Sequence, residues 1–145
     1  MKKRAITGVM LALCTSFAWS GEKEDAVKLV HDAAAAVAKD KSGSLAEIGK
    51  AGGHFVKGEL YVFVYDMGGV MVAHPINPKL VGKSLLEVPD ADGKMFRKDI
   101  ISAVTTTGTA TVDYKYKNPT TGKVEEKITY CKKAADLAVC AGYYK

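Results

Sequence analysis

Residues 60–82, LYVFVYDMGGVMVAHPINPKLVG, decide the fold of this 145-residue chain. They hold an apolar run, a Gly-Gly pair, a second apolar run and, directly after it, His74-Pro75. Both alternating sets of residues 61–66 are largely apolar, which predicts a central strand covered on both faces. The glycine pair supplies the positive φ angles of a tight hairpin turn. Because Pro75 and the proline at position 78 cannot continue a ladder, we expect the chain to leave the sheet after His74.

The segment before this stretch has helical periodicity. Residues 22–41, EKEDAVKLVHDAAAAVAKDK, place valines and alanines at helical spacing, with acidic residues in the first turn, where the helix dipole favours them. A second short helix is expected after the Ser42-Gly43 break, with Ser44 as N-cap and Glu47 completing a capping box. The domain therefore opens with a long helix followed by a short one.

The segment after His74-Pro75 predicts a crossover and a meander. The crossover, to about residue 108, holds a loop and one helix over residues 94–105. Three strands follow, at residues 109–116, 125–132 and 137–144, the first two joined by a turn-forming NPTTG segment. The fold class is α+β, with a five-stranded antiparallel sheet, a long N-terminal helix, and the crossover loop and helix over one face. This is the layout of PAS-like and profilin-like sensors.

The first 20 residues have the plan of a secretory signal peptide. Three basic residues precede an apolar stretch of about a dozen residues, and Ala18-Trp19-Ser20 offers a cleavage site after Ser20. A retained N-terminal anchor and a lipid on Cys14 are the alternatives. We therefore expect a leader at residues 1–20 and a single periplasmic domain at residues 21–145.

The charge of the mature chain argues against nucleic acid as a partner. Removal of the leader takes away three of the 21 basic residues and none of the 16 acidic ones, which lowers the net charge from +5 to +2. No basic cluster larger than a pair such as Lys132-Lys133 remains. Without a strong positive field, phosphate binding has no electrostatic basis.

Two cysteines remain after the leader, Cys131 and Cys140, nine positions apart. The centre of the intervening segment, residues 134–136, predicts a turn between two strands, so the two cysteines face each other across a hairpin. A disulfide between them fits an exported protein. Two free thiols or a metal-binding pair are the alternatives.

Three separated motifs occur in a characteristic order: D-x-x-G-x-x-x-x-H-P at residues 66–75, D-x-D-G-x-x-F at residues 90–96, and K-x-x-Y at residues 127–130. With the sequence around them they resemble the single Cache domain of the second type (sCache_2). This family consists of extracellular or periplasmic sensing modules of bacterial chemoreceptors and histidine kinases, and also includes solitary secreted domains. The resemblance covers nearly all of residues 21–145, but the chain ends directly after the last strand. We therefore expect that it either passes its ligand or its conformational state to another protein or has a role other than signalling.

The resemblance implies a small ligand between one sheet face and the crossover, of the acetate, propionate, pyruvate or lactate type. A buried carboxylate needs cations or strong donors in an apolar, aromatic pocket. The candidate ligand-binding residues are His74, Lys127, Tyr130, Tyr114, Tyr61, Tyr65, Phe96 and Arg97.

Each candidate has a structural alternative. His74 stands where the chain leaves the sheet, so it either contacts ligand or caps the strand end through the backbone around Pro75. Lys127 lies in mid-strand, where an inward lysine needs an anion and an outward one needs nothing. Regular alternation puts Lys127 and Tyr130 on opposite faces, so both can line one pocket only across a bulge.

The remaining candidates have weaker signals. The four tyrosine and phenylalanine positions, Tyr61, Tyr65, Tyr114 and Phe96, could equally be core aromatics. Arg97 is the one arginine of residues 21–145, and its helical spacing predicts a solvent-facing site.

Three classes of function follow. The leading one is a periplasmic sensory module that binds a short organic acid and acts with a separate sensor kinase, chemoreceptor or transporter. The alternative is a ligand-free interaction or structural protein that forms a homodimer through the alanine-rich face of residues 33–38. An enzyme is disfavoured, because no catalytic triad, carboxylate pair, metal spacing or phosphate loop is visible, and no cofactor is implied.

Overall fold

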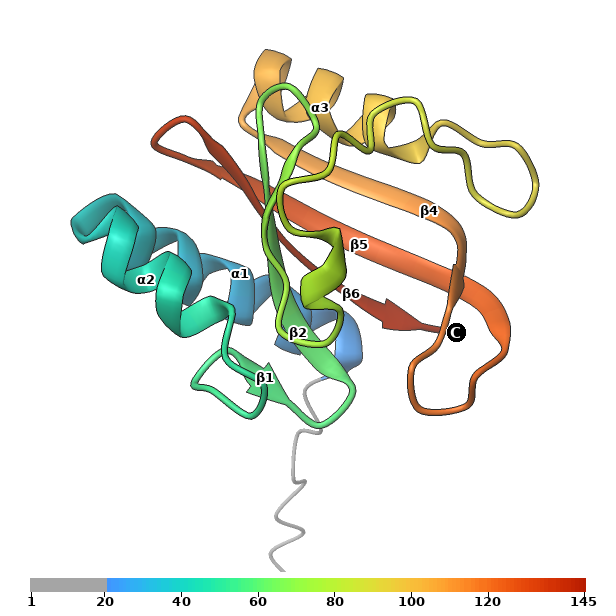
Figure 1. Ribbon diagram of the computed structural model, residues 1–145, viewed down its shortest axis with the longest axis horizontal. Helices are drawn as coiled ribbons and strands as arrows, with labels where there is room; N and C mark the ends of the chain where they lie inside the picture. Colours follow the sequence, from blue (N-terminus) through green and yellow to red (C-terminus); the bar gives the residue numbers. More distant parts are fainter. Residues whose placement is uncertain (1–20) are drawn as a thin grey trace, which may run out of the picture.

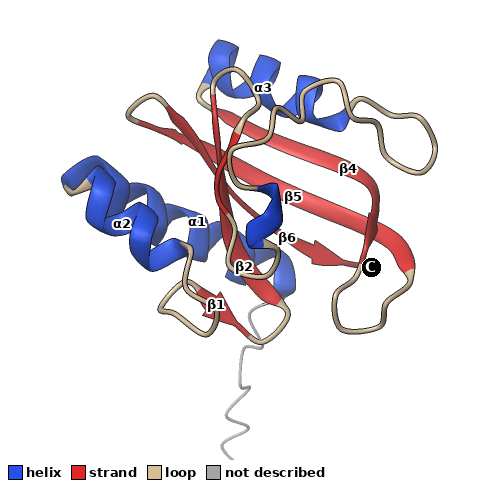
Figure 2. Cartoon of the chain, viewed as in Figure 1, coloured by secondary structure: helices blue, strands red, loops and turns tan. Residues whose placement is uncertain are grey.

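The computed structural model describes residues 21–145, so the expected leader lies outside the described residues. One antiparallel sheet carries helices on both sides (Figures 1 and 2). None of the described helices is both long enough and apolar enough to cross a bilayer. The elements are, in order, α1 (Glu22–Lys39), α2 (Lys41–Ile48), β1 (Val56–Lys57), β2 (Leu60–Asp66), β3 (Met71–Ala73), the 3-10 turn η1 (Pro78–Leu80), α3 (Phe96–Thr107), β4 (Thr109–Lys117), β5 (Val124–Ala134) and β6 (Leu137–Tyr144).

The sheet confirms the predicted α+β architecture. Its strand order is β1-β2-β6-β5-β4, and β3 pairs with β2 farther along the same edge as β1. The five expected strands are all present, and the two-residue β1 adds a short sixth. Strands β4, β5 and β6 form the expected meander, and β6 lies against β2. The strand that was expected to be central is thus buried on both faces.

The two faces of β2 separate two cores. Its valines, Val62 and Val64, pack with α1 and α2 on one side of the sheet. Its aromatic residues, Tyr61, Phe63 and Tyr65, pack with α3 and the crossover on the other. Figure 1 shows α1 and α2 on one side and α3 on the other. Much of the alanine-rich face of α1 is buried against the chain's own sheet, with Ala33 and Ala34 nearly inaccessible.

Helix α2 begins earlier than the sequence predicted. The cap is Asp40, whose carboxylate accepts a hydrogen bond from the Gly43 backbone N–H, so the prediction of Ser44 as N-cap is wrong. Asp40 and Ser44 are both good capping residues, and Asp40 also ends α1, so one residue serves the junction of the two helices. Glu47 instead accepts a hydrogen bond from the His54 backbone.

The crossover is tied to the sheet edge by its backbone. The Leu85 N–H donates to the Gly69 carbonyl, and the Gly82 N–H donates to the Met71 carbonyl. Gly69 has φ +83°, and a Cβ there would lie 2.8 Å from the Leu86 Cβ. Glycine is therefore required at the β2–β3 turn both for backbone conformation and for this close approach.

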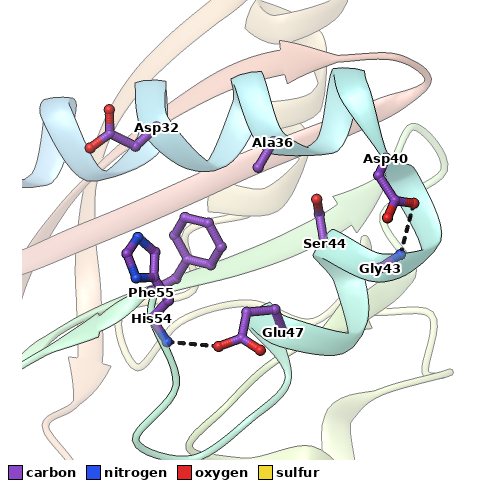
Figure 3. A pocket seen from close by; sticks show the side chains of 8 residues that line it. All are labelled: Asp32, Ala36, Asp40, Gly43, Ser44, Glu47, His54 and Phe55. Atoms are coloured by element: carbon purple, nitrogen blue, oxygen red, sulfur yellow. Dashed lines mark hydrogen bonds between the residues drawn. The ribbon is translucent and has the colours of Figure 1, made fainter.

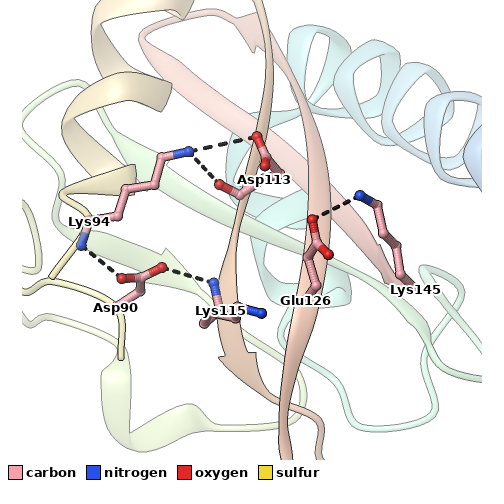
Figure 4. A network of polar contacts seen from close by, with 6 residues as sticks. All are labelled: Asp90, Lys94, Asp113, Lys115, Glu126 and Lys145. Carbon is pink, nitrogen blue, oxygen red and sulfur yellow. Dashed lines mark hydrogen bonds and ion pairs between the residues drawn. The ribbon is translucent and has the colours of Figure 1, made fainter. Parts of the chain in front are cut away.

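Asp90, the first acid of the D-x-D-G motif, joins the crossover to β4. Its carboxylate accepts hydrogen bonds from the backbone N–H groups of Asp92, Lys94 and Lys115, at 2.8–2.9 Å. Figure 4 shows the two from Lys94 and Lys115. Burial opposes ionisation of this carboxylate, but these three donors outweigh it and hold the pKa of Asp90 below its usual value. The Lys94 ammonium also reaches the Asp113 carbonyl.

The hairpin of β5 and β6 carries the predicted disulfide. Cys131 and Cys140 are directly opposed in register, bonded, and fully buried on the crossover side of the sheet. Ala135 turns the hairpin with φ 50°. The alternatives of free thiols and of a metal pair are thereby excluded for this structure.

We predict that Asp90→Ala destabilises the domain by about 1–3 kcal/mol, because three backbone donors lose their acceptor. Asp92→Ala is the matched control, since the Asp92 side chain accepts no hydrogen bond among the described residues, and it should stay within ~0.5 kcal/mol of the parent. Urea unfolding measures both. Equal effects of the two substitutions would contradict the assigned role of Asp90.

Candidate functional site

Lys127 is the centre of the site. Its side chain leaves β5 toward the crossover and is 1% exposed. The Nζ atom donates a hydrogen bond to the Tyr61 hydroxyl at 3.1 Å. Four aromatic rings surround the Nζ atom, with centroids 4.7–5.3 Å away: Tyr61, Phe63, Tyr116 and Tyr144. Such rings attract a cation through their electron-rich faces.

This buried cation has no acidic partner among residues 21–145. No aspartate or glutamate is buried anywhere in residues 21–145. Burial, with a further contribution from the charge of Arg97, lowers the pKa of Lys127 to about 7. Aromatic rings compensate a buried ammonium less completely than a carboxylate does. The site is therefore electrostatically incomplete in a way that an anion would correct.

The path of Lys127 depends on a glycine that the sequence did not single out. Gly142 on β6 faces Thr129, and a Cβ at Gly142 would lie 2.7 Å from the Lys127 Cε atom. A side chain at position 142 would therefore displace the lysine. Tyr144, two residues on, completes the ring cage and donates a hydrogen bond to the Lys117 carbonyl.

His74 has the predicted capping role, and it also lines the inner cavity, where ligand contact stays a prediction. Its Nδ1 atom accepts hydrogen bonds from the backbone N–H groups of Ile76 and Asn77, at 3.2 and 2.9 Å, so it caps the chain after Pro75. An accepting Nδ1 places the proton on Nε2. The imidazole lies against the rings of Tyr61 and Phe63. Burial, together with the charges of Lys127 and Arg97, lowers the pKa of His74 to about 4, which keeps it neutral.

Arg97 is buried, so the prediction of a solvent-facing arginine is wrong. Its Nε donates to the Tyr65 hydroxyl and its Nη1 to the Val88 carbonyl, both at 3.1 Å. Its guanidinium also lies 4.2 Å from the Phe96 ring centroid. Arg97 stands in the first turn of α3, and the crossover folds over that turn. Helical periodicity cannot reveal that a loop buries a residue from outside the helix.

The other aromatic candidates, Tyr65, Tyr114 and Phe96, pack around the site on the crossover side of the sheet. Tyr114 stacks on Phe96 with ring centroids 3.8 Å apart, and its hydroxyl shares a hydrogen bond with Thr129. Burial raises the pKa of Tyr65 to about 12, despite the opposing charge of Arg97, and raises the pKa of Tyr114 well above its usual value. These phenols therefore stay protonated and act as hydrogen-bonding groups.

Tyr130 lies apart from this group, on the opposite face of β5. Its ring stacks on His31 of α1, and β5 is regular from Lys127 to Tyr130. No bulge brings the two residues to one side. The structure thus places seven of the eight candidate residues on the crossover side and Tyr130 on the helix side.

Two hollows lie next to each other here. The inner cavity measures about 10 Å³, room for about one water molecule, and is lined by Tyr61, Phe63, Tyr65, Met71, His74, Tyr114, Tyr116 and Lys127. An outer groove of about 290 Å³ shares Tyr61, His74 and Tyr116 with it. These three side chains separate Lys127 from the groove. Tyr61 is held by Lys127 and His74 by backbone, whereas the Tyr116 hydroxyl makes no hydrogen bond to any described residue.

A larger hollow of about 500 Å³ lies on the other side of the sheet (Figure 3). It is an open cleft between α1, α2 and the segment at His54 and Phe55, with Asp32, Asp40 and Glu47 along its wall. The Asp40 and Glu47 carboxylates there are occupied as caps for the backbone of Gly43 and His54. Within residues 21–145, no three His, Cys, Asp or Glu side chains are placed to bind a metal.

Residues 21–143 match the family Single Cache domain 2. The chain belongs to that family. It is therefore a Cache sensory ligand-binding domain, of a family of non-catalytic sensor modules, as the three motifs predicted.

Solved structures agree on the fold of this Cache domain. A methyl-accepting chemotaxis protein from Vibrio parahaemolyticus superimposes with a TM-score of 0.71 at 23% identity, covering 84% of this chain and 87% of that one. A Cache chemosensory domain, solved to show carboxylic acid recognition, gives a TM-score of 0.70 at 22% identity, covering 84% and 92%. A periplasmic sensor domain of a chemotaxis protein gives 0.65 at 27% identity, covering 83% and 88%.

Among curated proteins, the sensor histidine kinase MctS of Rhizobium johnstonii is 31% identical over 70 residues. That alignment covers 48% of this chain and only 15% of the kinase. The likeness is thus to a small part of a much longer receptor.

We predict that His74 makes the stability of the Cache domain pH-dependent between pH 6.5 and 4. Its folded pKa of about 4 lies below the ordinary 6.5, so the neutral ring stabilises the fold fully above pH 6.5. That stabilisation is lost as the pH falls toward 4, and we expect a loss of about 2–3 kcal/mol. Urea unfolding at several pH values measures it.

The matched variants are His74→Ala, which should flatten this part of the profile, and His31→Ala, which should retain it, because His31 is exposed. Parallel profiles for the parent and His74→Ala would contradict the assigned cap.

Proposed function

We propose that this Cache domain binds a short organic acid, of the acetate, propionate, pyruvate or lactate type, with its carboxylate against Lys127. The observation that carries the proposal is a fully buried ammonium without an acidic partner in the part of the chain that the structure describes. Two further cationic or donor groups are buried on the same side of the sheet, Arg97 and the Nε2–H of His74. A carboxylate would complete this set of charges.

The surroundings of Lys127 favour a small ligand with an apolar part. Phenylalanine and tyrosine rings enclose the ammonium, so a methyl or ethyl group would contact ring surface while its carboxylate meets Nζ. Phosphate would lack apolar contacts and would need more donors than the cavity offers. The carboxylic acid recognition named for a structure of the same fold supports this class of ligand.

We infer that the ligand enters from the outer groove. The inner cavity of about 10 Å³ holds no organic acid as it stands, and the groove beside it holds about 290 Å³. Tyr116 is the side chain with the least restraint between the two. Rotation of its ring toward the groove would open the way to Lys127.

The cellular setting of the proposal is extracytoplasmic. A buried disulfide persists where thiols are not kept reduced, and one relative of the same fold is a periplasmic sensor domain. We propose that residues 1–20 are the leader and residues 21–145 the domain. Its bound state would be read by a signalling or transport partner, such as a kinase or a chemoreceptor.

Thermal unfolding against C2 to C4 carboxylates tests the proposal. Ligand at a hundredfold excess over its Kd should add about 2.7 kcal/mol of stability. Lys127→Met keeps the bulk of the side chain but removes its charge, and it should abolish the shift. Lys133→Met is the matched control, because Lys133 lies on the same face of β5 but is exposed.

The same shift should be larger at pH 6 than at pH 9. A carboxylate needs the protonated ammonium, and the protonated fraction of Lys127 falls as the pH rises through its pKa of about 7. No shift with any acid would sink the carboxylate proposal and favour the ligand-free interaction protein. A shift that survives in Lys127→Met would place the site elsewhere.

A further inference from the structure

We propose that Lys127 is also a nucleophile, and that this Cache domain holds 2-oxo acids such as pyruvate as a reversible imine on its Nζ atom. The inference rests on the proposed function, because the carbonyl must first be brought to Lys127 by a carboxylic acid ligand. It extends that function from simple binding to covalent capture, and it distinguishes oxo acids from the corresponding hydroxy acids.

The geometry isolates one amine from all others. Lys127 is the only buried lysine of residues 21–145, and it lines the inner cavity. Its Nζ makes one hydrogen bond, to the Tyr61 hydroxyl, and no ion pair with any described residue. An amine that is not tied to a carboxylate can lose its proton without breaking a salt bridge.

None of the described groups that face Lys127 carries a negative charge that would pair with the ammonium. They come from five elements: Tyr61 and Phe63 on β2, His74 after β3, Arg97 on α3, Tyr116 on β4 and Tyr144 on β6. The phenols and the imidazole are neutral, and Arg97 is cationic. The lowered pKa of Lys127, about 7 in the ligand-free domain, means that neutral amine and ammonium coexist at physiological pH. A bound carboxylate favours the ammonium, so the attack on the keto carbon proceeds from the neutral fraction that remains. Desolvation next to a second cation is a recognised way to make a lysine nucleophilic.

The chemical step is balanced without an oxidant or reductant. The lone pair of neutral Nζ attacks the carbonyl carbon, and a proton moves from nitrogen to oxygen to give a carbinolamine. The carbinolamine then loses its hydroxyl group and the remaining N–H proton as water, which leaves a C=N bond. Protonation of the imine restores a cation among the rings of Tyr61, Phe63, Tyr116 and Tyr144. Hydrolysis reverses the step, so the capture is reversible.

Reductive trapping tests the inference on the mature, oxidised domain. The protein is incubated with pyruvate and sodium cyanoborohydride at pH 7, and intact mass and peptide mapping then locate adducts. We expect one reduced pyruvyl group per molecule, on Lys127, reached at pyruvate concentrations that leave the surface lysines unmodified. Lactate is the matched acid without a keto group. It should compete with pyruvate and reduce the trapped fraction.

The variant that separates the two roles of Lys127 is Lys127→Arg, which keeps a cation but offers no amine for imine formation. It should lose the specific adduct entirely. Absence of an adduct on Lys127 in the parent protein overturns the imine, as does labelling spread evenly over the surface lysines. If lactate and pyruvate still shift thermal unfolding in that case, the proposed carboxylate site stands. If neither does, both proposals fail.

Discussion

The burial of one ammonium group organises the functional half of this protein. Lys127 needs a strand that points it inward, a glycine at position 142 beside it, and rings from three other strands around its head. The rings attract the cation but leave its charge uncompensated. A domain selected for stability alone would have placed an apolar side chain there. Our proposal is that a ligand supplies the other half of this interaction.

The rest of the fold keeps that charge apart from water. Strand β2 turns its valines toward α1 and α2 and its aromatic residues toward Lys127, so one strand supports both cores. The chain then leaves the sheet at His74-Pro75, and the imidazole caps the backbone that follows. The strand pattern runs directly into this dipeptide because the same residue has to close the sheet edge and line the cavity. At the far end of the crossover, the Asp90 carboxylate accepts a hydrogen bond from the Lys115 backbone and so fastens the crossover to β4.

Alternation and turn chemistry predicted the parts of this site that lie on strands. The two-sided pattern of β2 and the facing cysteines follow from a period of two. The same period placed Lys127 and Tyr130 on opposite faces, as the structure shows, but it left open which of the two points inward. Arg97 was misplaced because its burial comes from a loop folded over the first turn of α3.

Other features left no signal in the sequence. Glycine is needed at position 142 only because the Lys127 side chain from β5 passes over it. Tyr144 reaches Lys127 only because β6 lies between β2 and β5. The prediction of Ser44 as the cap failed for a different reason: Asp40 and Ser44 are both good capping residues, and it is Asp40 that accepts the hydrogen bond from the Gly43 N–H. Long-range contacts of this kind depend on strand order, which periodicity does not specify.

The most direct measurement is the NMR titration of the Lys127 side chain itself, with ¹⁵N-labelled lysine and the Lys127→Met variant to assign the signal. The account predicts a midpoint near pH 7 in the ligand-free domain, against about 10.4 for ordinary lysines, and a rise when a bound carboxylate supplies the missing charge. An ordinary midpoint in the ligand-free protein, unmoved by any organic acid, would show that the ammonium already has a partner and would contradict the account.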